Sequence, residues 1–298
     1  MAARVRLAVT LGDPRGIGPE VVRKALADPR VAASIETTVI GPAGTEQAPD
    51  LVTGTWTPAG SAADAGHLAG LAIQRAVRLA QSGAVQGIVT APIEKAALAA
   101  GGFDYPGHTE MLSALTQRDV AMMLASERLR VVLVTTHIAL RDVPAAVTPE
   151  AIARTAAVTL RGLQDWYGIV EPRVALCGLN PHLGDGGRFG TEDDAVLAPA
   201  ARAAGLAGPF SADTVFVRAI GGEFDAVIAP YHDVGMTAIK VASFGRAVNV
   251  TLGLPFPRTS PDHGTALDIA GSGRARPDSM VEAMLACAAL ARRLTPEA

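Results

Sequence analysis

The stretch RVALCGLNPHLGDGG, residues 173–187, joins an apolar run to a segment built for turning. The run at 173–179 has the length and composition of a buried strand. The segment at 178–187 holds four glycines, a proline, an Asn and an Asp, which predicts a loop. In its middle stands His182. The pattern is thus a strand followed by a glycine-rich loop that carries a histidine. The same pattern can be looked for in the rest of the chain.

Short apolar runs and helical patterns alternate on both sides of this stretch. The other predicted strands span residues 6–12, 37–41, 87–92, 120–125, 130–136, 225–230 and 248–254, and the predicted helices span 18–27, 62–81, 108–115, 148–167, 191–204 and 278–294. Residues 42–60 are expected to form a surface connection with one or two short strands. Strands that alternate with helices predict an α/β fold with a mostly parallel core.

Composition limits the classes to which the chain can belong. Hydrophobic residues make up 49% of its 298 residues and charged residues 18%, which is typical of a globular chain. A net charge of −3 without a basic run argues against nucleic-acid binding, and no apolar stretch reaches the ~20 residues that span a bilayer. The two cysteines lie far apart, and the N-terminus lacks a signal-type apolar run, so we expect a cytoplasmic protein. Cys177 is expected to be a small core residue.

Two further histidines follow strands as His182 does. His137 ends RVVLVTTH and His232 ends DAVIAPYH, with room for a crossover helix between successive histidines. Ligands bind beyond the carboxyl ends of strands in parallel α/β sheets, so three imidazoles could converge there. Three imidazoles with an open position are typical of a catalytic divalent-metal site. A single histidine at a strand end is more often a hydrogen-bonded loop residue, and spacing alone leaves both interpretations open.

Other polar residues are candidates for anion binding. In YPGHTEML, residues 105–112, His108 and Thr109 stand at an expected helix start, where free N–H groups attract anions, although Thr109 could equally be an ordinary N-cap. In TLGDPRGIGPEVV, residues 10–22, the glycines do not form GxGxxG and give only a weak nucleotide signal. Arg258 follows a strand-like run and suits a carboxylate or phosphate, unless it is a solvated surface residue.

Seven motifs, in order, resemble those of 4-hydroxythreonine-4-phosphate dehydrogenase and its close relatives. They are GDPRGIGPE, GHTE, TTHIALRDV, GLNPHLGDGGRFGTED, ADTVF, YHDVGMTAIK and VNVTLGLPFPRTSPDHGTALDIAG. The resemblance implies a two-domain α/β fold like that of isocitrate and isopropylmalate dehydrogenases, with mostly parallel central sheets and no Rossmann domain. It implies a cofactor-side domain at residues 1–105 plus 245–298, a metal and substrate domain at 106–244, and an active site in the cleft between them.

The resemblance also implies roles for individual residues. One divalent metal (zinc, magnesium, cobalt or manganese) would be bound by His137, His182 and His232. The substrate would be bound by His108, Thr109, Lys240, Asn249 and Arg258, and NAD or NADP by Asp13, Gly16 and Gly18. Candidates for the general base are Asp233, Asp213 and Lys240. The family works as a homodimer in which each active site draws on both subunits.

The reaction that the resemblance implies is NAD(P)-linked oxidation, with decarboxylation, of a 4-phosphorylated C4 hydroxy acid such as 4-phosphohydroxy-L-threonine, in pyridoxine biosynthesis. The metal would polarise the substrate hydroxyl, a base would take its proton, and hydride would pass to the nicotinamide. Val234 stands where the family usually has Gln, which leaves 4-phosphoerythronate or 4-phosphothreonate open as the substrate. A dihydrodiol dehydrogenase is less favoured because GHTE is present. A metal-dependent hydrolase and a non-catalytic phosphate-metabolite binder remain alternatives from other classes.

Overall fold

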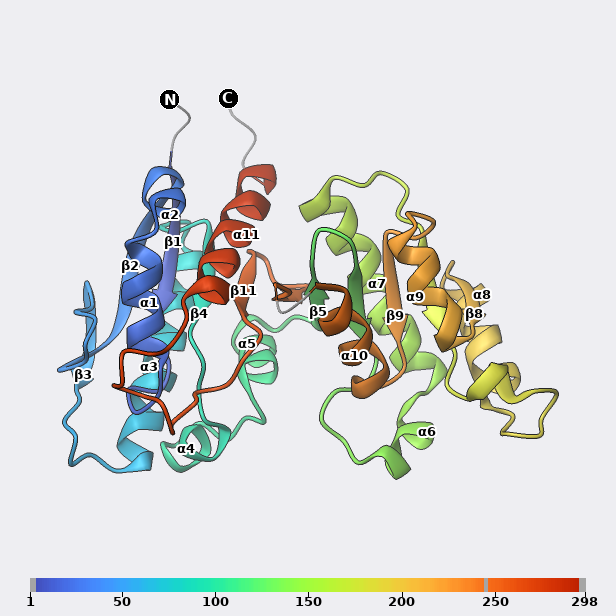
Figure 1. Ribbon diagram of the computed structural model, residues 1–298, viewed down its shortest axis with the longest axis horizontal. Coiled ribbons are helices and arrows are strands. Elements are labelled where there is room, and N and C mark those ends of the chain that lie inside the picture. Colours follow the sequence, from blue (N-terminus) through green and yellow to red (C-terminus); the bar gives the residue numbers. More distant parts are fainter. Residues whose placement is uncertain (1–3, 244–245, 295–298) are drawn as a thin grey trace. The chain divides into compact units, whose positions relative to one another are not determined.

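The computed structural model describes residues 4–243 and 246–294. The chain divides into two compact units (Figure 1). Unit 1 takes its described residues from 4–118 and 254–294, and unit 2 from 119–243 and 246–253. The first change of unit thus falls at 118–119, beyond the expected 105–106, because the helix that starts at His108 packs against a helix of unit 1. The second expected boundary, at 244–245, lies outside the described residues.

The sheet of unit 1 is parallel in every pairing described. Its strands are ordered β3 (Leu51–Thr55), β2 (Ile35–Ala43), β1 (Val5–Thr10), β4 (Gly87–Thr90) and β11 (Arg258–Pro261). The chain moves one way along the sheet from β1 to β2 and the other way from β3 to β4. Right-handed crossovers therefore put the connecting helices on opposite faces.

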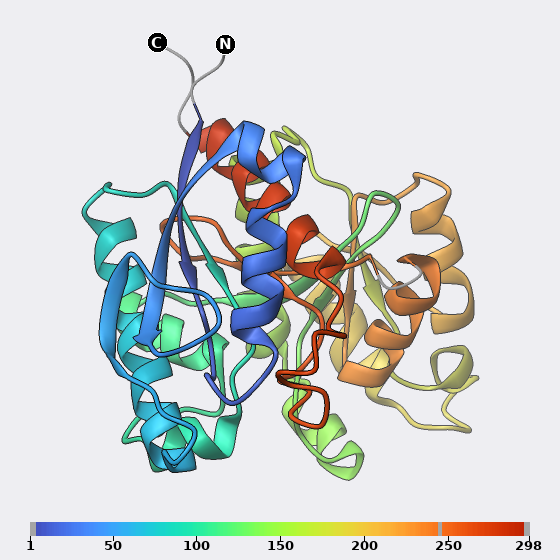
Figure 2. The same ribbon diagram turned by 60° about the vertical axis from the view of Figure 1, so that its left-hand side comes forward.

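The helices of unit 1 follow this rule. On one face α11 (Asp278–Leu294) packs on β1, β4 and β11, beside α1 (Gly18–Leu26) and α2 (Pro29–Ser34). On the other, α3 (Ala62–Gln81) packs on β1, β2 and β4, beside α4 (Lys95–Ala100) and α5 (His108–Thr116). Figure 2 shows α1 and α11 next to each other, although they come from opposite ends of the sequence.

Unit 2 holds a mixed sheet. Its strands are ordered β10 (Val248–Leu252), β5 (Ala121–Ala125), β6 (Arg130–Leu133), β9 (Ala226–Ala229), β7 (Val174–Cys177) and β8 (Ala207–Phe210). The β10–β5 and β5–β6 pairs are antiparallel, whereas β6–β9, β9–β7 and β7–β8 are parallel. One face packs on α7 (Pro149–Tyr167), and the other on α9 (Ala212–Ile220) and α10 (His232–Ser243).

The remaining helical segments of unit 2 are short. They are Leu140–Asp142, α6 (Val143–Ala146), Pro181–Gly184, the π-helical turn Asp193–Leu197 and α8 (Ala198–Ala203). The helix expected at 191–204 is helical without a break from 192 to 203, but its first part, Asp193–Leu197, is π-helical. Within the described parts of the chain, we find no helix that has both the length and the apolar composition to cross a membrane.

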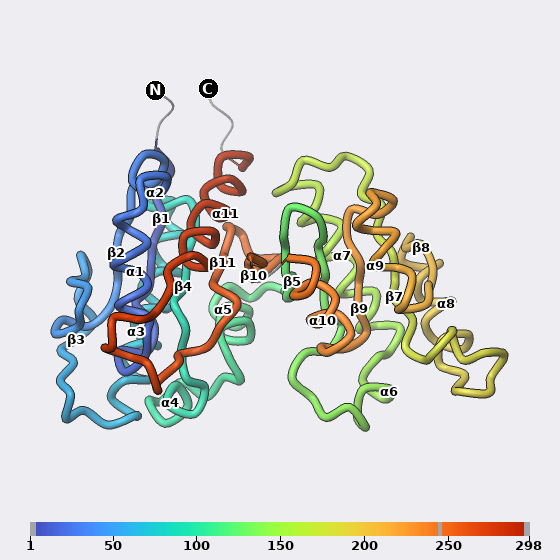
Figure 3. Tube along the Cα trace, in the orientation of Figure 1, coloured from blue at the N-terminus to red at the C-terminus, as the bar shows by residue number. Residues whose placement is uncertain are grey.

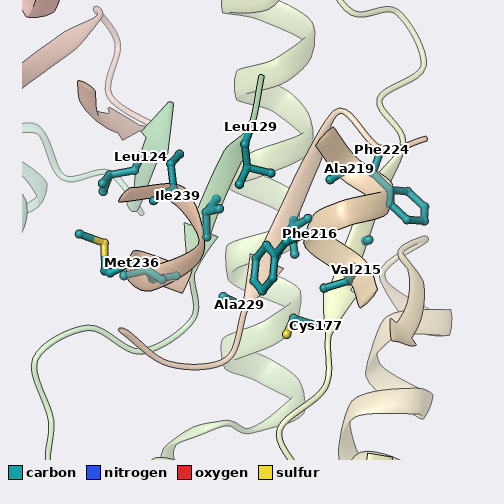
Figure 4. Packing of buried hydrophobic residues seen from close by; sticks show 14 of the residues in the cluster. Leu124, Leu129, Cys177, Val215, Phe216, Ala219, Phe224, Ala229, Met236 and Ile239 are labelled. Atoms are coloured by element: carbon teal, nitrogen blue, oxygen red, sulfur yellow. The ribbon is translucent and has the colours of Figure 1, made fainter. Parts of the chain in front are cut away.

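The core of unit 2 explains why its strands read as apolar runs. Leu124 of β5, Cys177 of β7 and Ala229 of β9 lie in one buried cluster with residues of the covering helices, among them Val215 of α9 and Ile239 of α10 (Figure 4). Cys177 lies in this cluster and is fully buried, which confirms the prediction of a small core residue. Burial raises the pKa of its thiol to about 12, so the sulfur stays protonated.

Candidate active site

Three neighbouring strands of unit 2 end at one edge of its sheet, and each is followed by one of the predicted metal ligands. β9 pairs in parallel with β6 on one side and with β7 on the other. His137 follows β6, His232 follows β9 and His182 follows β7. The carboxyl ends of parallel strands meet at one edge, so the topology delivers all three histidines there.

Two of these histidines lie side by side. The ring centroids of His137 and His232 are 5.4 Å apart, and the rings are tilted by 44°. Two imidazoles that bind one ion at a metal–nitrogen distance near 2.1 Å bring their centroids to roughly 5 Å. The Nδ1 atom of His232 is also 2.8 Å from Oδ1 of Asp233, a hydrogen bond that leaves Nε2 as the nitrogen for a ligand. This pair therefore fits two ligand positions of a metal site.

His182 lies in an exposed loop with an unusual backbone. The φ angles of His182, Leu183 and Asp185 are +51°, +58° and +46°, in the left-handed region that costs a residue with a side chain about 1–3 kcal/mol. The carboxylate of Asp193 holds the loop in place, since it accepts hydrogen bonds from the backbone N–H of Leu179 (2.7 Å) and of Asn180 (2.9 Å). The glycine-rich segment thus forms a turn between β7 and α8 (Figure 3), and His182 on this turn is exposed.

The structure does not bring all three histidines together. Across residues 4–243 and 246–294, no group of three His, Cys, Asp or Glu side chains is arranged to hold a metal ion. His137 and His232 are adjacent, whereas His182 does not complete a three-residue group with them. The three-histidine metal site therefore stays a prediction.

The candidate bases differ in their distance from the histidines. Asp233 contacts His232 directly. Asp213 is exposed at the start of α9, which follows β8, the strand next to β7. Lys240 is exposed on α10, eight residues after His232, so about 12 Å of helix separates the two backbones.

Asn249, a predicted substrate ligand, is directed to a different part of the sheet. Through Leu124 it is in register with Val131, in the first half of β6, while His137 follows the carboxyl end of that strand. Its Oδ1 is shielded from solvent and has no hydrogen-bond partner in the described parts of the chain. Within unit 2, Asn249 is therefore not at the histidine edge.

In unit 1, His108 and Thr109 occupy the first turn of α5, as predicted. The N-cap is Gly107, and no side chain caps this nine-residue helix, so Thr109 is not the cap. His108 is partly exposed as a residue, but its ring Nε2 is shielded and has no hydrogen-bond partner among residues 4–243 and 246–294. The start of α5 thus offers uncapped N–H groups, a hydroxyl and a buried ring nitrogen.

Arg258 lies close to this helix start and is fully buried. It is the first residue of β11, only 2% exposed, and its Nη2 donates to Oγ1 of Thr90 at 2.5 Å. Burial lowers its pKa to about 10, which still leaves it charged at neutral pH. The alternative of a solvated surface cation is therefore wrong for Arg258, whereas Lys240 is exposed.

The same surroundings keep His108 neutral. Burial, and then the positive charge of Arg258, hold the pKa of His108 well below its usual range. At neutral pH the ring is thus a polar but uncharged partner, and the fixed positive charge next to it is that of Arg258.

Other parts of unit 1 pack closely against the glycine-containing loop that follows β1. Asp13 is buried and its carboxylate accepts from the backbone N–H (3.0 Å) and the guanidinium of Arg15. A Cβ on Gly16 would lie 2.8 Å from the Thr265 carbonyl oxygen, and one on Gly18 would lie 2.2 Å from that of Leu11. Close backbone packing therefore accounts for both glycines, and the role of Asp13, Gly16 and Gly18 in cofactor binding stays a prediction.

Sequence reasoning missed three polar residues that shape these sites. Asp193 anchors the His182 loop, Thr90 holds Arg258, and Lys95 opens α4 near the start of α5. Lys95 lies five residues after β4, much as the histidines follow their strands, whereas Thr90 is the last residue of β4 itself. The rule that identified the histidines would have identified Lys95, whereas nothing in the sequence marks Asp193 as buried.

Comparisons with known proteins agree with the motifs over nearly the whole chain. The family model of the pyridoxal phosphate biosynthetic protein PdxA matches residues 19–287. A relative from Desulfosudis oleivorans, named 4-hydroxythreonine-4-phosphate dehydrogenase, is 42% identical over 328 positions, covering 95% of each chain. The crystal structure of 4-hydroxythreonine-4-phosphate dehydrogenase from Klebsiella pneumoniae is 38% identical, with a TM-score of 0.85 over 97% of this chain and 100% of that one.

More distant structures define the fold. A terephthalate 1,2-cis-dihydrodiol dehydrogenase from Burkholderia xenovorans is 26% identical, with a TM-score of 0.64, over 94% of this chain and 96% of its own. An isocitrate dehydrogenase from Methylococcus capsulatus is 15% identical, with a TM-score of 0.51, over 94% and 85%. The second likeness concerns the fold alone, and it confirms the predicted α/β fold of the isocitrate dehydrogenase type.

Proposed function

This chain belongs to the PdxA family of pyridoxal phosphate biosynthetic proteins, and from that membership we propose that it oxidises 4-hydroxythreonine 4-phosphate. The relatives are named as dehydrogenases, which are oxidoreductases acting on a CH–OH group, and the chain is an enzyme of that class. The finer points proposed are the metal, the NAD(P) cofactor, the loss of CO₂ and the residue roles.

His137, His232 and His182 are the residues that would hold a divalent metal. A bound ion would supply Lewis-acid polarisation of the substrate hydroxyl, and NAD(P)⁺ would accept the hydride. The observation that carries this proposal is the His137–His232 pair at the ends of two adjacent parallel strands. In this scheme Asp233 holds the His232 ring in one tautomer, and Asp233, Asp213 or Lys240 takes the hydroxyl proton.

The anionic part of the substrate would be bound by the start of α5. Thr109 and the first N–H groups of the helix donate hydrogen bonds, and Arg258 supplies charge from the interior. The oxidised substrate is a β-keto acid, so its loss of CO₂ needs only that the developing negative charge be stabilised.

We further propose a homodimer with shared active sites. Lys240 and Asn249 are predicted substrate ligands, yet within unit 2 they are displaced along the strand direction from the histidine edge. Two subunits related by a two-fold axis can combine residues that one subunit keeps apart. The separation within unit 2 therefore supports sites that draw on both chains.

The test is an assay with Mg²⁺ or Zn²⁺, NAD⁺ or NADP⁺ and a panel of 4-phosphorylated C4 hydroxy acids. Growth of NAD(P)H absorbance with 4-hydroxythreonine 4-phosphate is the expected result. Product formed without the cofactor would instead identify a metal-dependent hydrolase, and saturable binding without any product would identify a non-catalytic binder.

Val234 is the reason for including 4-phosphoerythronate and 4-phosphothreonate among the compounds tested. This side chain, two residues after His232, packs against the apolar core of unit 2. Where Gln would bring an amide to the start of α10, this chain presents a hydrocarbon. Preference for 4-phosphoerythronate or 4-phosphothreonate over 4-hydroxythreonine 4-phosphate would fit that change.

A further inference from the structure

We propose that Lys95 is a further anion-binding residue, which supplies a second positive charge, besides that of Arg258, to the start of α5. The ligand group is an oxyanion of the substrate, either its phosphate or its carboxylate. The inference rests on the proposed function, since it concerns the same site and names a residue with no role so far.

The position of Lys95 comes from its contact with the N-cap of α5. A Cβ built on Gly107 would lie 3.6 Å from Cε of Lys95 and 3.4 Å from Oε2 of Glu110. Lys95 is exposed in the first turn of α4, yet the last carbon of its side chain reaches the residue from which α5 begins. A methyl group at position 107 would therefore be in ordinary van der Waals contact with the end of the Lys95 side chain.

The charges around this point favour an anion. The positive end of a helix dipole lies at its start, and Lys95 lies close to the start of the nine-residue helix α5. Glu110 is the carboxylate nearby, and it interacts with the charge of Arg258 as well as lying near Lys95. Glu94, the neighbour of Lys95, is paired with Arg15. Lys95, Arg258 and the start of α5 together outweigh the charge of Glu110, so this region is positive.

A second observation concerns the ring of His108, in the first turn of the same helix. Nε2 of His108 is shielded from solvent and has no hydrogen-bond partner in the described chain. A buried polar atom without a partner is costly, and an oxyanion at the start of α5 would supply the missing acceptor. No side chain caps the helix, so its first N–H groups are available to the same oxyanion.

Arg258 and Lys95 differ in ways that suit two different roles in anion binding. Arg258 is rigid, buried and held by Thr90, so it provides a fixed charge. Lysine is a compact charge on a flexible stem that can follow a ligand as it enters. We therefore assign to Lys95 the capture of the oxyanion from solvent, ahead of its seating on α5.

The experiment compares Lys95→Met with Lys95→Arg, which keeps the charge. Arg75→Met, on the exposed side of α3 in the same unit, is the matched control for loss of one surface charge. Lys95→Met should raise the KM for 4-hydroxythreonine 4-phosphate about ten- to a hundredfold, with kcat changed by less than about threefold. Lys95→Arg and Arg75→Met should stay within about threefold of the wild type, and the KM for NAD(P)⁺ should not change.

The kinetics of Lys95→Met with 4-hydroxythreonine, which lacks the phosphate, show which group of the substrate Lys95 binds. A defect confined to the phosphorylated compound identifies the phosphate, and equal defects on both identify the carboxylate. A rise in the KM for NAD(P)⁺ alone, or wild-type kinetics in Lys95→Met, would overturn the proposal.

Calorimetric binding of inorganic phosphate separates this inference from the proposed function. Wild-type enzyme should bind phosphate at least about tenfold more tightly than Lys95→Met. That comparison holds even if the protein oxidises none of the compounds tested. Equal phosphate binding by wild type and Lys95→Met, or none by either, would overturn the role of Lys95 whatever the reaction proves to be.

Discussion

His182 combines a predicted chemical role with an uncommon backbone conformation, so its replacement must separate the two. His182→Ala should abolish turnover and leave the free energy of unfolding within about 1 kcal/mol, because the residue is exposed and its backbone is held by others. His182→Asn is the matched control, since Asn tolerates a left-handed φ. Kinetics at saturating metal, with urea unfolding of both variants, decide the matter. Full activity in either variant would rule out a ligand role.

Thr109 offers a test of anion binding that does not disturb helix capping. The N-cap of α5 is Gly107, so Thr109→Val should barely change stability. It should lower kcat/KM for the phosphorylated substrate about ten- to a hundredfold, or ~1.4–2.7 kcal/mol, by removing one hydrogen-bond donor. The analogue without phosphate should lose much less. Equal losses on the two compounds would show that the hydroxyl does not contact the phosphate.

The buried ring of His108 makes stability depend on acid. Because its pKa is lowered in the folded protein, the unfolded chain binds this proton first, and stability present above pH ~6.5 is lost as the pH falls below that value. One such group steepens the loss by up to about 1.4 kcal/mol per pH unit. Urea unfolding between pH 7.5 and pH 5 should therefore be less pH-dependent in His108→Gln than in the wild type. Parallel curves would contradict a buried neutral imidazole.

At the scale of elements, the loop at 178–190 is held by the side chain of Asp193, which lies outside the loop. The carboxylate of Asp193 is almost completely buried and accepts from Leu179, Asn180 and the Asn180 amide. Asp193→Ala should cost about 2–4 kcal/mol and accelerate hydrogen exchange at Leu179 and Asn180. Asp194→Ala removes the same charge from an exposed neighbour and should do neither. Unchanged exchange in Asp193→Ala would mean that the loop holds its own shape.

Elements with clear local signals could be predicted from the sequence. The helix expected at 62–81 matches α3, where Ser61 and Asp64 cap each other, and the one expected at 148–167 matches α7, with Thr148 as its N-cap. Apolar strands such as β6, β9 and β7 were recognisable because both faces of their sheet are covered. The α/β class followed from these elements.

Other elements take their form from contacts between distant residues. β11 reads Arg-Thr-Ser-Pro and gives no apolar signal, yet all four residues are buried beside β4 and α11. The sequence therefore left a solvated position open as the alternative for Arg258, which the burial of β11 excludes. The same holds for the approach of Lys95 to Gly107 and for the left-handed turn at His182. Both depend on contacts with residues farther along the chain, which no local sequence pattern predicts.

For the whole molecule, the proposal of shared active sites has a direct test. Sedimentation should show a dimer. On dilution, the activity should fall as the dimer dissociates into monomers. Mixing two inactive variants, His137→Ala and Asn249→Ala, should restore activity, because a mixed dimer would contain one intact site. Random pairing would give about a quarter of wild-type activity. An active monomer, or no recovery from mixtures shown to form mixed dimers, would contradict shared sites.

The division of unit 1 into two stretches of sequence bears on how the protein is made. As the chain leaves the ribosome, β1, β2, β3 and β4 emerge early, but β11 and α11 follow only after the whole of unit 2. At ordinary rates of translation that interval is on the order of ten seconds. Meanwhile β4 has an unpaired edge, and the face of the sheet that α11 will cover is open to water. Unit 2 is one continuous stretch of sequence, so it can fold before β11 and α11 are made. During that interval the nascent chain contains a folded unit 2 and an incomplete unit 1. The incomplete unit exposes apolar surface, to which chaperones bind.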